Sequence, residues 1–376
     1  MANKRGNNEG SIYKRKDGRW TAAITLPAGA RKSFYGSTRQ EVAAKLAEAI
    51  RNKDKGLPAI NERRTLAAYL QEWLVAVKPT IRASTWDRYE QYVRVHLTPA
   101  IGRFTLARLT PAQLNAFYAM KLEENLSSTT VAHMHTVLHT ALERAVRWGY
   151  VARNVVALAD RPRMAHAEMR TFTAEQARAF LIGVRGDRFE ALYTLALSTG
   201  MRQGELLALR WEHVNLEESA LQVRATVYRG KDGMVFGEPK TDRSRRQVSL
   251  TATAVEALRR HRVRQIEERL RSGSSWDDLD LVFPNEIGRP VEPGNLLRRS
   301  YWPLLEQAGL PRLRFHDLRH SAATLLLERG THPKIVADML GHSQVSVTLD
   351  RYSHVTPTMH RQAADTMEVI LHAVGD

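Results

Sequence analysis

The sequence predicts a multidomain α+β protein, with a small three-stranded sheet plus one helix, then an all-α helical bundle, then a mostly α domain with a small antiparallel sheet. The chain of 376 residues is too long for one ordinary core of about 150 residues. Its apolar residues alternate with period two near the N-terminus and follow a helical period after residue 64. Two polar, basic stretches interrupt this pattern. They divide the chain into residues 1–60, 61–163 and 170–376.

The chain is strongly basic, with a formal charge of +16 and a pI near 10.2. The simplest partner for such an excess is a polyphosphate such as nucleic acid. Residues 1–64 contain fifteen Lys and Arg against six Asp and Glu, so the excess is concentrated there. A basic surface that only keeps the protein in solution is the alternative.

The sequence contains no cysteine, which excludes disulfides, thiolate nucleophiles and zinc sites built from cysteine. The N-terminus lacks the apolar segment of a signal peptide, and no apolar run approaches the ~20 residues that span a bilayer. We therefore expect a cytoplasmic protein without a membrane partner.

Residues 11–56 have the pattern of a small sheet followed by a helix. Alternate residues from Trp20 to Leu26 are apolar and share one face, and a third short strand is expected at Lys32–Tyr35. Ser and Thr at 37–38, followed three residues later by Gln and Glu, predict a capping box that begins the helix. Because a β-ribbon can enter the major groove of DNA, we expect contacts from its basic side chains, although a merely solvated face is the alternative. These side chains are Lys14, Arg15, Lys16, Arg19, Arg31 and Lys32.

Residues 65–160 have the pattern of a bundle of four or five helices. The first carries apolar residues at helical spacing from Leu66 to Val77. The expected starts of the next three are Ser84, as the cap of a helix over Thr85–His96, Thr110-Pro111, and Ser128. Polar and basic residues outside the bundle make it a second candidate for DNA contact, although they could serve solubility alone. The expected contact residues are Arg82, Ser84, Arg88 and Arg144.

Two groups have some features of a metal site without completing one. His135 and His139 lie four residues apart on the fourth predicted helix, but no third ligand is placed beside them. Asp277, Asp278 and Asp280 lie in a loop flanked by Ser and Gly, where a solvated acidic turn is the simpler interpretation. We expect no metal and no other cofactor, since the sequence also lacks a GxxxxGK[ST] nucleotide loop.

The third domain begins at a capping box formed by Thr173 and Gln176. A helix is expected over Met201–Trp211, and its first turn places Arg202 beside backbone N–H groups that can bind an anion. Glu205, one turn later, can hold the Arg202 side chain in place. A surface arginine without a ligand is the alternative.

Strands are expected at Leu221–Thr226, Met234–Phe236 and Gln247–Leu250, with Lys240 on a hairpin between the last two. A lysine near other cations can protonate a leaving group, because like charge lowers the pKa of an amine toward neutrality. An ordinary hairpin lysine is the alternative. Further helices are expected at Thr253–Leu270, Asn295–Ala308 and His316–Glu328.

Near its end the chain has a series of cationic and imidazole side chains followed by one tyrosine. His316 and Arg319 lie one turn apart on a predicted helix, His342 follows in Leu-Gly-His-Ser, and Tyr352 follows in Asp-Arg-Tyr-Ser-His. This order suits an enzyme whose phenol attacks a phosphodiester. A negatively charged phosphorus centre needs charge neutralisation, hydrogen bonds and proton transfer, which these side chains supply.

Five motifs in residues 171–376 resemble those of the tyrosine recombinases, the phage integrase family. They are Thr199-Gly-Met-Arg-Gln-Gly-Glu205, Pro239-Lys-Thr241, His316-Asp-Leu-Arg-His320, Leu340-Gly-His-Ser343 and Arg351-Tyr-Ser-His354. The resemblance implies a catalytic set in the order Arg202, Lys240, His316, Arg319, His342 and Tyr352. It also implies that the helical bundle is a core-binding domain and that the basic N-terminal sheet is similar to an arm-type DNA-binding domain of bivalent phage or mobile-element integrases.

The resemblance implies a role for each member of this set. Tyr352 would attack the scissile phosphate, forming a 3′-phosphotyrosyl bond and a free 5′-hydroxyl. The two arginines would clamp the non-bridging oxygens, and His342 would add a hydrogen bond. Lys240 would protonate the leaving oxygen, and His316 would act as base for a phenol whose ordinary pKa is near 10.

The implied partners are double-stranded DNA with core-type and arm-type sites, a homotetramer on DNA, a DNA-bending host factor and a recombination directionality factor, in the nucleoid of a bacterial host. Apolar residues at helical spacing from Met359 to Ile370 predict a tail helix. That helix packs either on its own core or, as the resemblance favours, on a neighbouring protomer. A type IB topoisomerase-like strand transferase and a catalytically idle DNA-binding regulator are the alternative functions.

Overall fold

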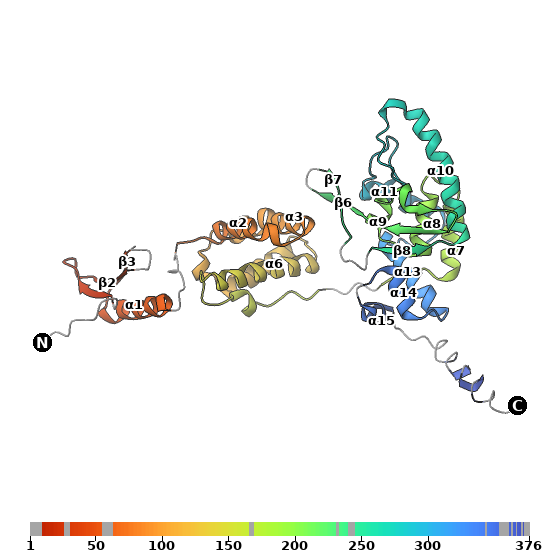
Figure 1. Cartoon of the computed structure of the whole chain (residues 1–376). Coiled ribbons are helices and arrows are strands. Elements are labelled where there is room, and N and C mark those ends of the chain that lie inside the picture. The colour runs from red at the N-terminus through yellow and green to blue at the C-terminus, as the bar shows by residue number, and fades with distance from the viewer. Residues whose placement is uncertain are drawn as a thin grey trace. The chain divides into compact units, whose positions relative to one another are not determined.

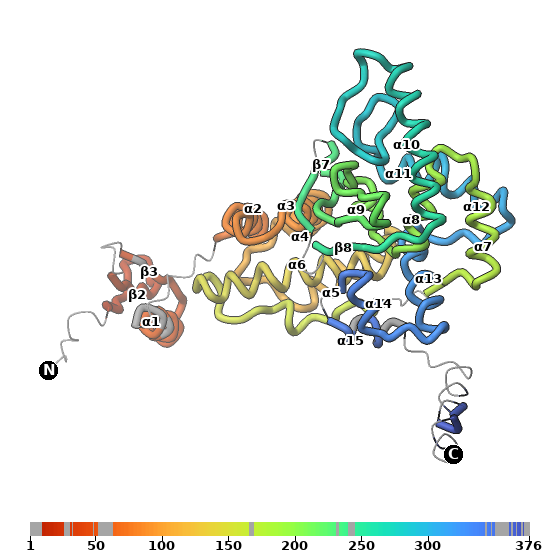
Figure 2. The backbone as a smooth tube through the Cα atoms, turned by 45° about the vertical axis from the view of Figure 1, so that its right-hand side comes forward, coloured from red at the N-terminus to blue at the C-terminus, as the bar shows by residue number. Residues whose placement is uncertain are grey.

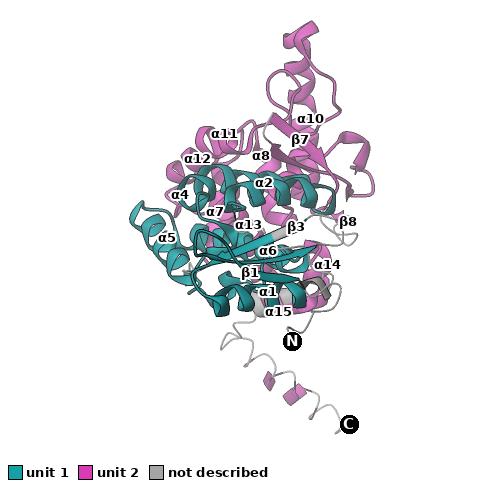
Figure 3. Cartoon of the chain, turned by 90° about the vertical axis from the view of Figure 1, so that its left-hand side faces the viewer, with its two compact units in different colours: residues 1–166 teal, residues 167–376 magenta. Residues whose placement is uncertain are grey.

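The computed structural model divides into two compact units, Met1–His166 and Ala167–Asp376 (Figure 3). Each unit is built around its own hydrophobic clusters. Among the described residues, no helix combines the length and apolar character needed to cross a membrane. The structure describes residues 10–25, 31–54, 63–164, 169–230, 233–239, 245–342, 344–352, 361, 364, 365, 367–369 and 371.

The N-terminal sheet of unit 1 is antiparallel with strand order β1-β2-β3, as the alternating pattern predicts. One face packs on α1, where Ile24 meets Val42 and Leu46. The predicted helix start forms with half of the capping box: the Thr38 hydroxyl accepts a hydrogen bond from the Glu41 N–H at 3.2 Å, while the Glu41 carboxylate accepts from the Ser37 N–H at 3.0 Å. The elements are β1 (Ser11–Lys14), β2 (Trp20–Thr25), β3 (Arg31–Gly36) and α1 (Arg39–Asp54) (Figure 1).

The basic residues expected to contact DNA lie on exposed parts of this sheet and its turn. The exposed members are Lys14, Arg15, Lys16, Arg19 and Arg31. Lys32 lies in β3, and its side chain is outside the described residues. The Arg15 guanidinium lies 5.8 Å from the centroid of the Tyr35 ring, so an exposed aromatic accompanies the positive charge. DNA contact by this group stays a prediction.

The second part of unit 1 is a helical bundle with a continuous apolar core. Trp73 of α2 stacks on Tyr89 of α3 with 5.5 Å between ring centroids, and Leu114 and Leu138 pack in the same cluster. The helices are α2 (Leu66–Val77), α3 (Ala83–Tyr92), α4 (Thr98–Ile101), α5 (Pro111–Glu123) and α6 (Ser128–Arg147), joined by the short turns η1 (Lys78–Thr80), η2 (Val93–Leu97), η3 (Leu106–Arg108) and η4 (Val155–Leu158).

The prediction that Ser84 caps α3 is wrong. The N-cap is Arg82, because its carbonyl already accepts hydrogen bonds from the N–H groups of Thr85 and Trp86, both at 2.9 Å. Ser84 therefore lies inside the first helical turn, where it is exposed. Arg88 on the same helix is also exposed.

The cap of α6 is Ser127 rather than the predicted Ser128, since its hydroxyl accepts from the Thr130 N–H at 3.2 Å. The start of α5 is confirmed, with a full capping box between Thr110 and Gln113. Ser127 and Ser128 have the same capping hydroxyl, so the sequence alone does not distinguish them; the helix begins at Ser128, which makes Ser127 the cap.

Two π-helical turns, η2 and η8 (Leu297–Tyr301), each lie directly before a helix whose second residue is proline. Proline has no N–H to donate to the preceding turn, and the wider π-turn accommodates its ring. The helices expected over Thr85–His96 and Asn295–Ala308 are therefore chains of shorter segments.

Unit 2 is arranged around α8, a helix buried along nearly its whole length that packs against α7, α10 and α13 (Figure 2). Tyr193 of α8 contacts the rings of Phe180, Tyr301 and Phe315. The helices are α7 (Ala174–Gly183), α8 (Glu190–Thr199), α9 (Gln203–Leu207), α10 (Ala252–Ser272), α11 (Pro293–Leu296), α12 (Trp302–Gln307), α13 (Phe315–Glu328), α14 (Pro333–Leu340) and α15 (Val345–Tyr352), with the short turns η5 (Trp211–His213) and η7 (Gly273–Ser275).

The predicted hairpin around Lys240 is wrong. β7 pairs with β6 in a separate ribbon, whereas β8 pairs with β5 in a sheet of order β4-β5-β8. The β6–β7 ribbon closes at Gly230 opposite Gly233, and such a local closure costs less entropy than a longer loop. The strand expected over Leu221–Thr226 is accordingly divided between two sheets. The strands are β4 (Val214–Asn215), β5 (Ala220–Val223), β6 (Thr226–Gly230), β7 (Gly233–Gly237) and β8 (Arg246–Ser249).

The helix expected over Met201–Trp211 is shorter than predicted, because α9 ends at Leu207. The backbone after it pairs with a distant segment instead of continuing the helix. Leu209 accepts from the Val282 N–H at 2.8 Å, and the Trp211 N–H donates to Asp280 at 2.9 Å.

Candidate active site

Arg202 is placed by the turn between α8 and α9. Gly200 ends α8 in the left-handed region, with φ 63°, and Arg202 is the N-cap of α9. A Cβ on Gly200 would overlap the Leu340 side chain, so glycine is required both by the backbone angle and by the space. The chain can therefore turn sharply and present Arg202 at a helix start.

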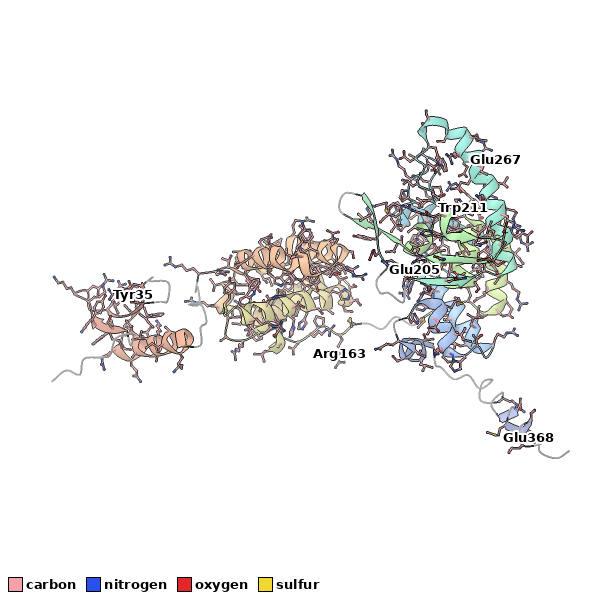
Figure 4. The ribbon with its side chains drawn as sticks, viewed as in Figure 1. Tyr35, Arg163, Glu205, Trp211, Glu267 and Glu368 are labelled. Atoms are coloured by element: carbon pink, nitrogen blue, oxygen red, sulfur yellow. The ribbon has the colours of Figure 1, made fainter. Side chains whose placement is uncertain are left out.

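Glu205 holds Arg202, as predicted. Its Oε1 lies 2.6 Å from Arg202 Nη1, and its Oε2 accepts from the Arg202 N–H at 3.1 Å. Glu205, labelled in Figure 4, is 3% exposed. The Arg202 side chain is 35% exposed, so the guanidinium keeps an open side. Burial alone raises the pKa of the Glu205 carboxyl, but Arg246 and Arg202 outweigh it and hold that pKa below its ordinary value.

Arg319 contacts the same turn from α13. It is 3% exposed, and its Nη1 donates to the Gly200 carbonyl at 2.8 Å. The acceptor lies two residues before Arg202, so the structure brings together two arginines from distant parts of the sequence.

His316 lies one turn before Arg319 on α13 and is exposed. Its ring meets the His320 ring edge-on, with 4.8 Å between centroids. Desolvation, followed by the charges of His320, Arg319 and Arg202, lowers the pKa of His316 to about 4. The imidazole is therefore neutral at neutral pH.

His342 follows the end of α14. Gly341 ends that helix with φ 68°, and the His342 N–H donates to the Ala337 carbonyl at 3.0 Å. The ring Nδ1 lies 2.7 Å from Oγ1 of Thr348, a buried residue of α15. Arg202 Nη2 makes a long contact of 3.5 Å with the Gly341 carbonyl, which places this turn beside the arginine.

Two members of the predicted set are located only by the backbone or not at all. Tyr352 is the last residue of α15, the helix that carries Thr348, and its side chain is outside the described residues. Lys240 lies in residues 240–244, which are also outside them. The structure therefore brings together Arg202, His316, Arg319 and the turn of His342, and leaves the other two as predictions.

Two further residues that were not predicted from the sequence contact this group. Thr348 orients His342, and Arg246 contacts Glu205 from the start of β8 at 3.1 Å. Neither has a local sequence signal, since Arg246 stands in a basic run that is typical of an exposed loop and Thr348 has the spacing of an ordinary helical residue.

The groups considered as metal sites have other partners. His135 Nδ1 lies 3.1 Å from the Tyr118 hydroxyl. Asp277 and Asp278 each pair with an arginine, at 2.5 and 2.8 Å. Across the part of the chain that the structure describes, no group of three His, Cys, Asp or Glu is placed to hold a metal ion.

Comparison with known proteins identifies the family. Residues 163–359 match the phage integrase family, and residues 65–122 match the N-terminal SAM-like domain of phage integrases. A XerC-like tyrosine recombinase of Caldanaerobacter subterraneus subsp. tengcongensis is 32% identical over 357 residues, covering 90% of this chain and 91% of that protein. The chain belongs to the phage integrase family. This integrase is thus a tyrosine site-specific recombinase, an enzyme that breaks and rejoins DNA.

Solved structures share the fold of this integrase. The integrase of transposon Tn1549, in complex with a circular intermediate DNA, matches with a TM-score of 0.68 at 19% identity, covering 81% of this chain and 99% of that one. A lambda integrase tetramer bound to a Holliday junction matches with a TM-score of 0.55 at 17% identity, covering 92% of this chain and 98% of that one. The mostly helical α+β architecture is therefore confirmed.

Proposed function

We propose that this integrase cleaves one DNA strand at a time through a 3′-phosphotyrosyl intermediate. Its catalytic set would be Arg202, Lys240, His316, Arg319, His342 and Tyr352. The observation that carries the proposal is the convergence of both arginines, His316 and the turn of His342, from α9, α13 and the end of α14. Such a group neutralises and hydrogen-bonds a phosphodiester.

The two arginines bind the non-bridging oxygens of the scissile phosphate. Arg202 uses one nitrogen to hold Glu205 and keeps an open side toward a ligand, while Arg319 is fixed by its bond to the Gly200 carbonyl. Planar guanidinium groups held in this way meet a phosphate without reorganising, which favours the crowded transition state. His342, oriented by Thr348, adds a hydrogen bond to the same oxygens.

The proton transfers of cleavage balance without a cofactor. As the Tyr352 oxygen bonds to phosphorus, its proton passes to His316, and the bond from phosphorus to the 5′-oxygen breaks. Lys240 gives a proton to that oxygen, which leaves as a hydroxyl. A neutral His316 can accept a proton, and a bound phosphate next to Arg202 and Arg319 offsets their charges and makes the imidazole a stronger base.

In this proposal, three parts of the chain have different roles on DNA. Residues 1–60 bind arm-type sites through the basic sheet, residues 61–163 bind core-type sites, and residues 170–376 carry out catalysis. Ser84 and Arg88 are exposed and lie four residues apart on one face of α3, which supports a contact surface there, and the exposed Arg82 is the N-cap of the same helix. Arg144 is partly buried and lies 5.9 Å from the centroid of the Trp148 ring, so it would reach DNA only with its guanidinium end.

The proposed assembly is a homotetramer on double-stranded DNA, by analogy with the lambda integrase tetramer. The tail expected from Met359 to Ile370 docks on a neighbouring protomer in this proposal. Most of its predicted apolar stripe lies outside the described residues, but Met367 is described and is exposed. A DNA-bending host factor and a directionality factor complete the partners, and the bacterial nucleoid is the proposed location.

Replacing Tyr352 with phenylalanine tests the nucleophile. The variant should form no covalent protein–DNA adduct, because it lacks the attacking oxygen, and should bind core-site DNA as the unaltered protein does. Adduct is measured on denaturing gels with a plasmid that carries the DNA flanking the integrase gene. An adduct formed by this variant would show that another residue is the nucleophile.

Paired attachment sites distinguish recombination from simple strand transfer. A recombinase yields products with exchanged flanks, whereas a topoisomerase-like enzyme only relaxes supercoils. Products with exchanged flanks are expected, and relaxation without them would favour the topoisomerase-like alternative. A protein that binds both sites and cleaves neither would be the idle regulator.

A further inference from the structure

We propose that Arg246 is a positioning residue of the active site: it fixes Glu205, and through it the Arg202 guanidinium, relative to the turn that carries His342. This inference rests on the proposed function. Arg246 begins β8, which lies between α9 and α14 (Figure 2). Its side chain can therefore reach both helices that present the proposed phosphate-binding groups.

The first contact of Arg246 is with a buried carboxylate. Arg246 Nη2 lies 3.1 Å from Glu205 Oε2, and the two side chains are 7% and 3% exposed. Removing an arginine from water costs free energy unless its charge is paired and its N–H groups find acceptors. A buried arginine is thus held by specific contacts, unlike the exposed arginines that give this chain its charge.

The second contact of Arg246 is with the end of α14. Its Nε donates to the Met339 carbonyl at 2.7 Å. Carbonyls in the last turn of a helix have no partner within the helix and carry partial negative charge, so a guanidinium suits them. A Cβ on Gly341 would lie 2.9 Å from Arg246 Nη1, so a glycine immediately before His342 makes room for this arginine.

The two contacts give Arg246 an electrostatic effect on Arg202. Glu205 Oε1 faces Arg202 and Oε2 faces Arg246, so one carboxylate is shared between two guanidinium groups. The trio keeps one net positive charge for an anion. Without Arg246, the full carboxylate charge would act on Arg202, drawing it toward Glu205 and weakening its attraction for a phosphate.

The next residue in the chain provides a matched control. Arg245 carries the same charge but is 44% exposed, and its Nη2 pairs with the exposed Glu238 at 2.9 Å. An Arg245→Gln change removes one positive charge at almost the same place in the sequence. It leaves the contacts of Arg246 with Glu205 and Met339 in place.

The experiment compares Arg246→Gln, Arg246→Lys, Glu205→Gln and the double variant Glu205→Gln/Arg246→Gln with Arg245→Gln, all in the full chain. The substrate is a plasmid that carries the DNA flanking the integrase gene. Single-turnover adduct formation and DNA binding are measured separately. We expect Arg246→Gln to slow adduct formation about 100-fold, as displacement of a catalytic group by about 1 Å does, with DNA affinity unchanged. Arg246→Lys keeps the charge but cannot span both contacts, so it should lie in between.

The double variant separates positioning from general structural support. If Arg246 acts through Glu205, the double variant should be no slower than the slower single variant. Effects that multiply, or an Arg246→Gln protein as fast as Arg245→Gln, would overturn the inference. If Arg246→Gln does not fold, Arg246→Lys is compared with Arg245→Gln instead. Equal rates of adduct formation in these two variants contradict the inference. Slower adduct formation by Arg246→Lys, at equal affinity for DNA, supports it. If neither the unaltered protein nor Arg245→Gln forms an adduct with this DNA, the proposed function itself is contradicted.

Discussion

Replacing Gly200 with alanine tests how closely α8 and α14 must approach to shape the active site. Gly200 has φ 63°, a region that costs an L-residue about 1–2 kcal/mol. The added Cβ would also overlap the buried Leu340 side chain, and overpacking of a core costs about 1–3 kcal/mol. The free energy of unfolding of unit 2 should therefore fall by about 2–5 kcal/mol.

Gly186 provides the control for backbone strain alone. It has φ 80°, but a Cβ there would have no atom within 4 Å. Gly186→Ala should therefore cost only the backbone term of about 1–2 kcal/mol. The difference in the free energy of unfolding between the two variants, about 1–3 kcal/mol, is then due to the overlap with Leu340 alone.

Hydrogen exchange measured by mass spectrometry suits this comparison, because a melting curve of the whole chain would mix the transitions of several domains. Peptides from α8 and α14 should exchange about 5- to 150-fold faster in Gly200→Ala than in Gly186→Ala. Gly200→Ala should also form the covalent adduct more slowly, since Arg319 is hydrogen-bonded to the Gly200 carbonyl. Equal exchange rates in the two variants would refute the argument that the helices are tightly packed at this glycine.

The remaining predictions concern a titration and a truncation. The pKa of His316 is about 4 when folded and about 6.5 when unfolded, so the stability it contributes is complete above pH 6.5 and is lost as the pH falls toward 4. In a His316→Gln protein, the free energy of unfolding should fall less steeply between pH 6.5 and pH 4, as measured by hydrogen exchange at several pH values. The same pH dependence in the variant and the unaltered protein would contradict the lowered pKa of His316. Deletion of residues 1–60 should weaken gel-shift binding to one class of DNA site while cleavage of core-site oligonucleotides persists, and unchanged binding to every site would contradict bivalent DNA binding.

Several local features were predictable from the sequence because one short segment contains the whole interaction. The side-chain caps at Thr38, Thr110 and Thr173 all form, because a cap and its partner lie only three residues apart. The caps of α3 and α6 were misplaced by two residues and one residue, whereas the errors in strand pairing and helix length arose where a distant segment decides the outcome. α9 ends early because the next residues pair with 280–282, and β8 pairs with β5 rather than with β7.

The sequence by itself determined the kinds of candidate catalytic group, their order and the helices that carry most of them, because residue types and periodicity are local properties. It also determined that Glu205 would hold Arg202, since the two lie one helical turn apart. Only the tertiary structure placed Arg319 on the Gly200 carbonyl and Arg246 between Glu205 and Met339. Those contacts join residues 119, 41 and 93 positions apart, and no pattern in the intervening chain encodes a distance between them. They follow from the packing of α9, α13, α14 and β8, which is why the sequence could name the arginines proposed to bind phosphate but not Arg246, which is proposed to hold one of them in position.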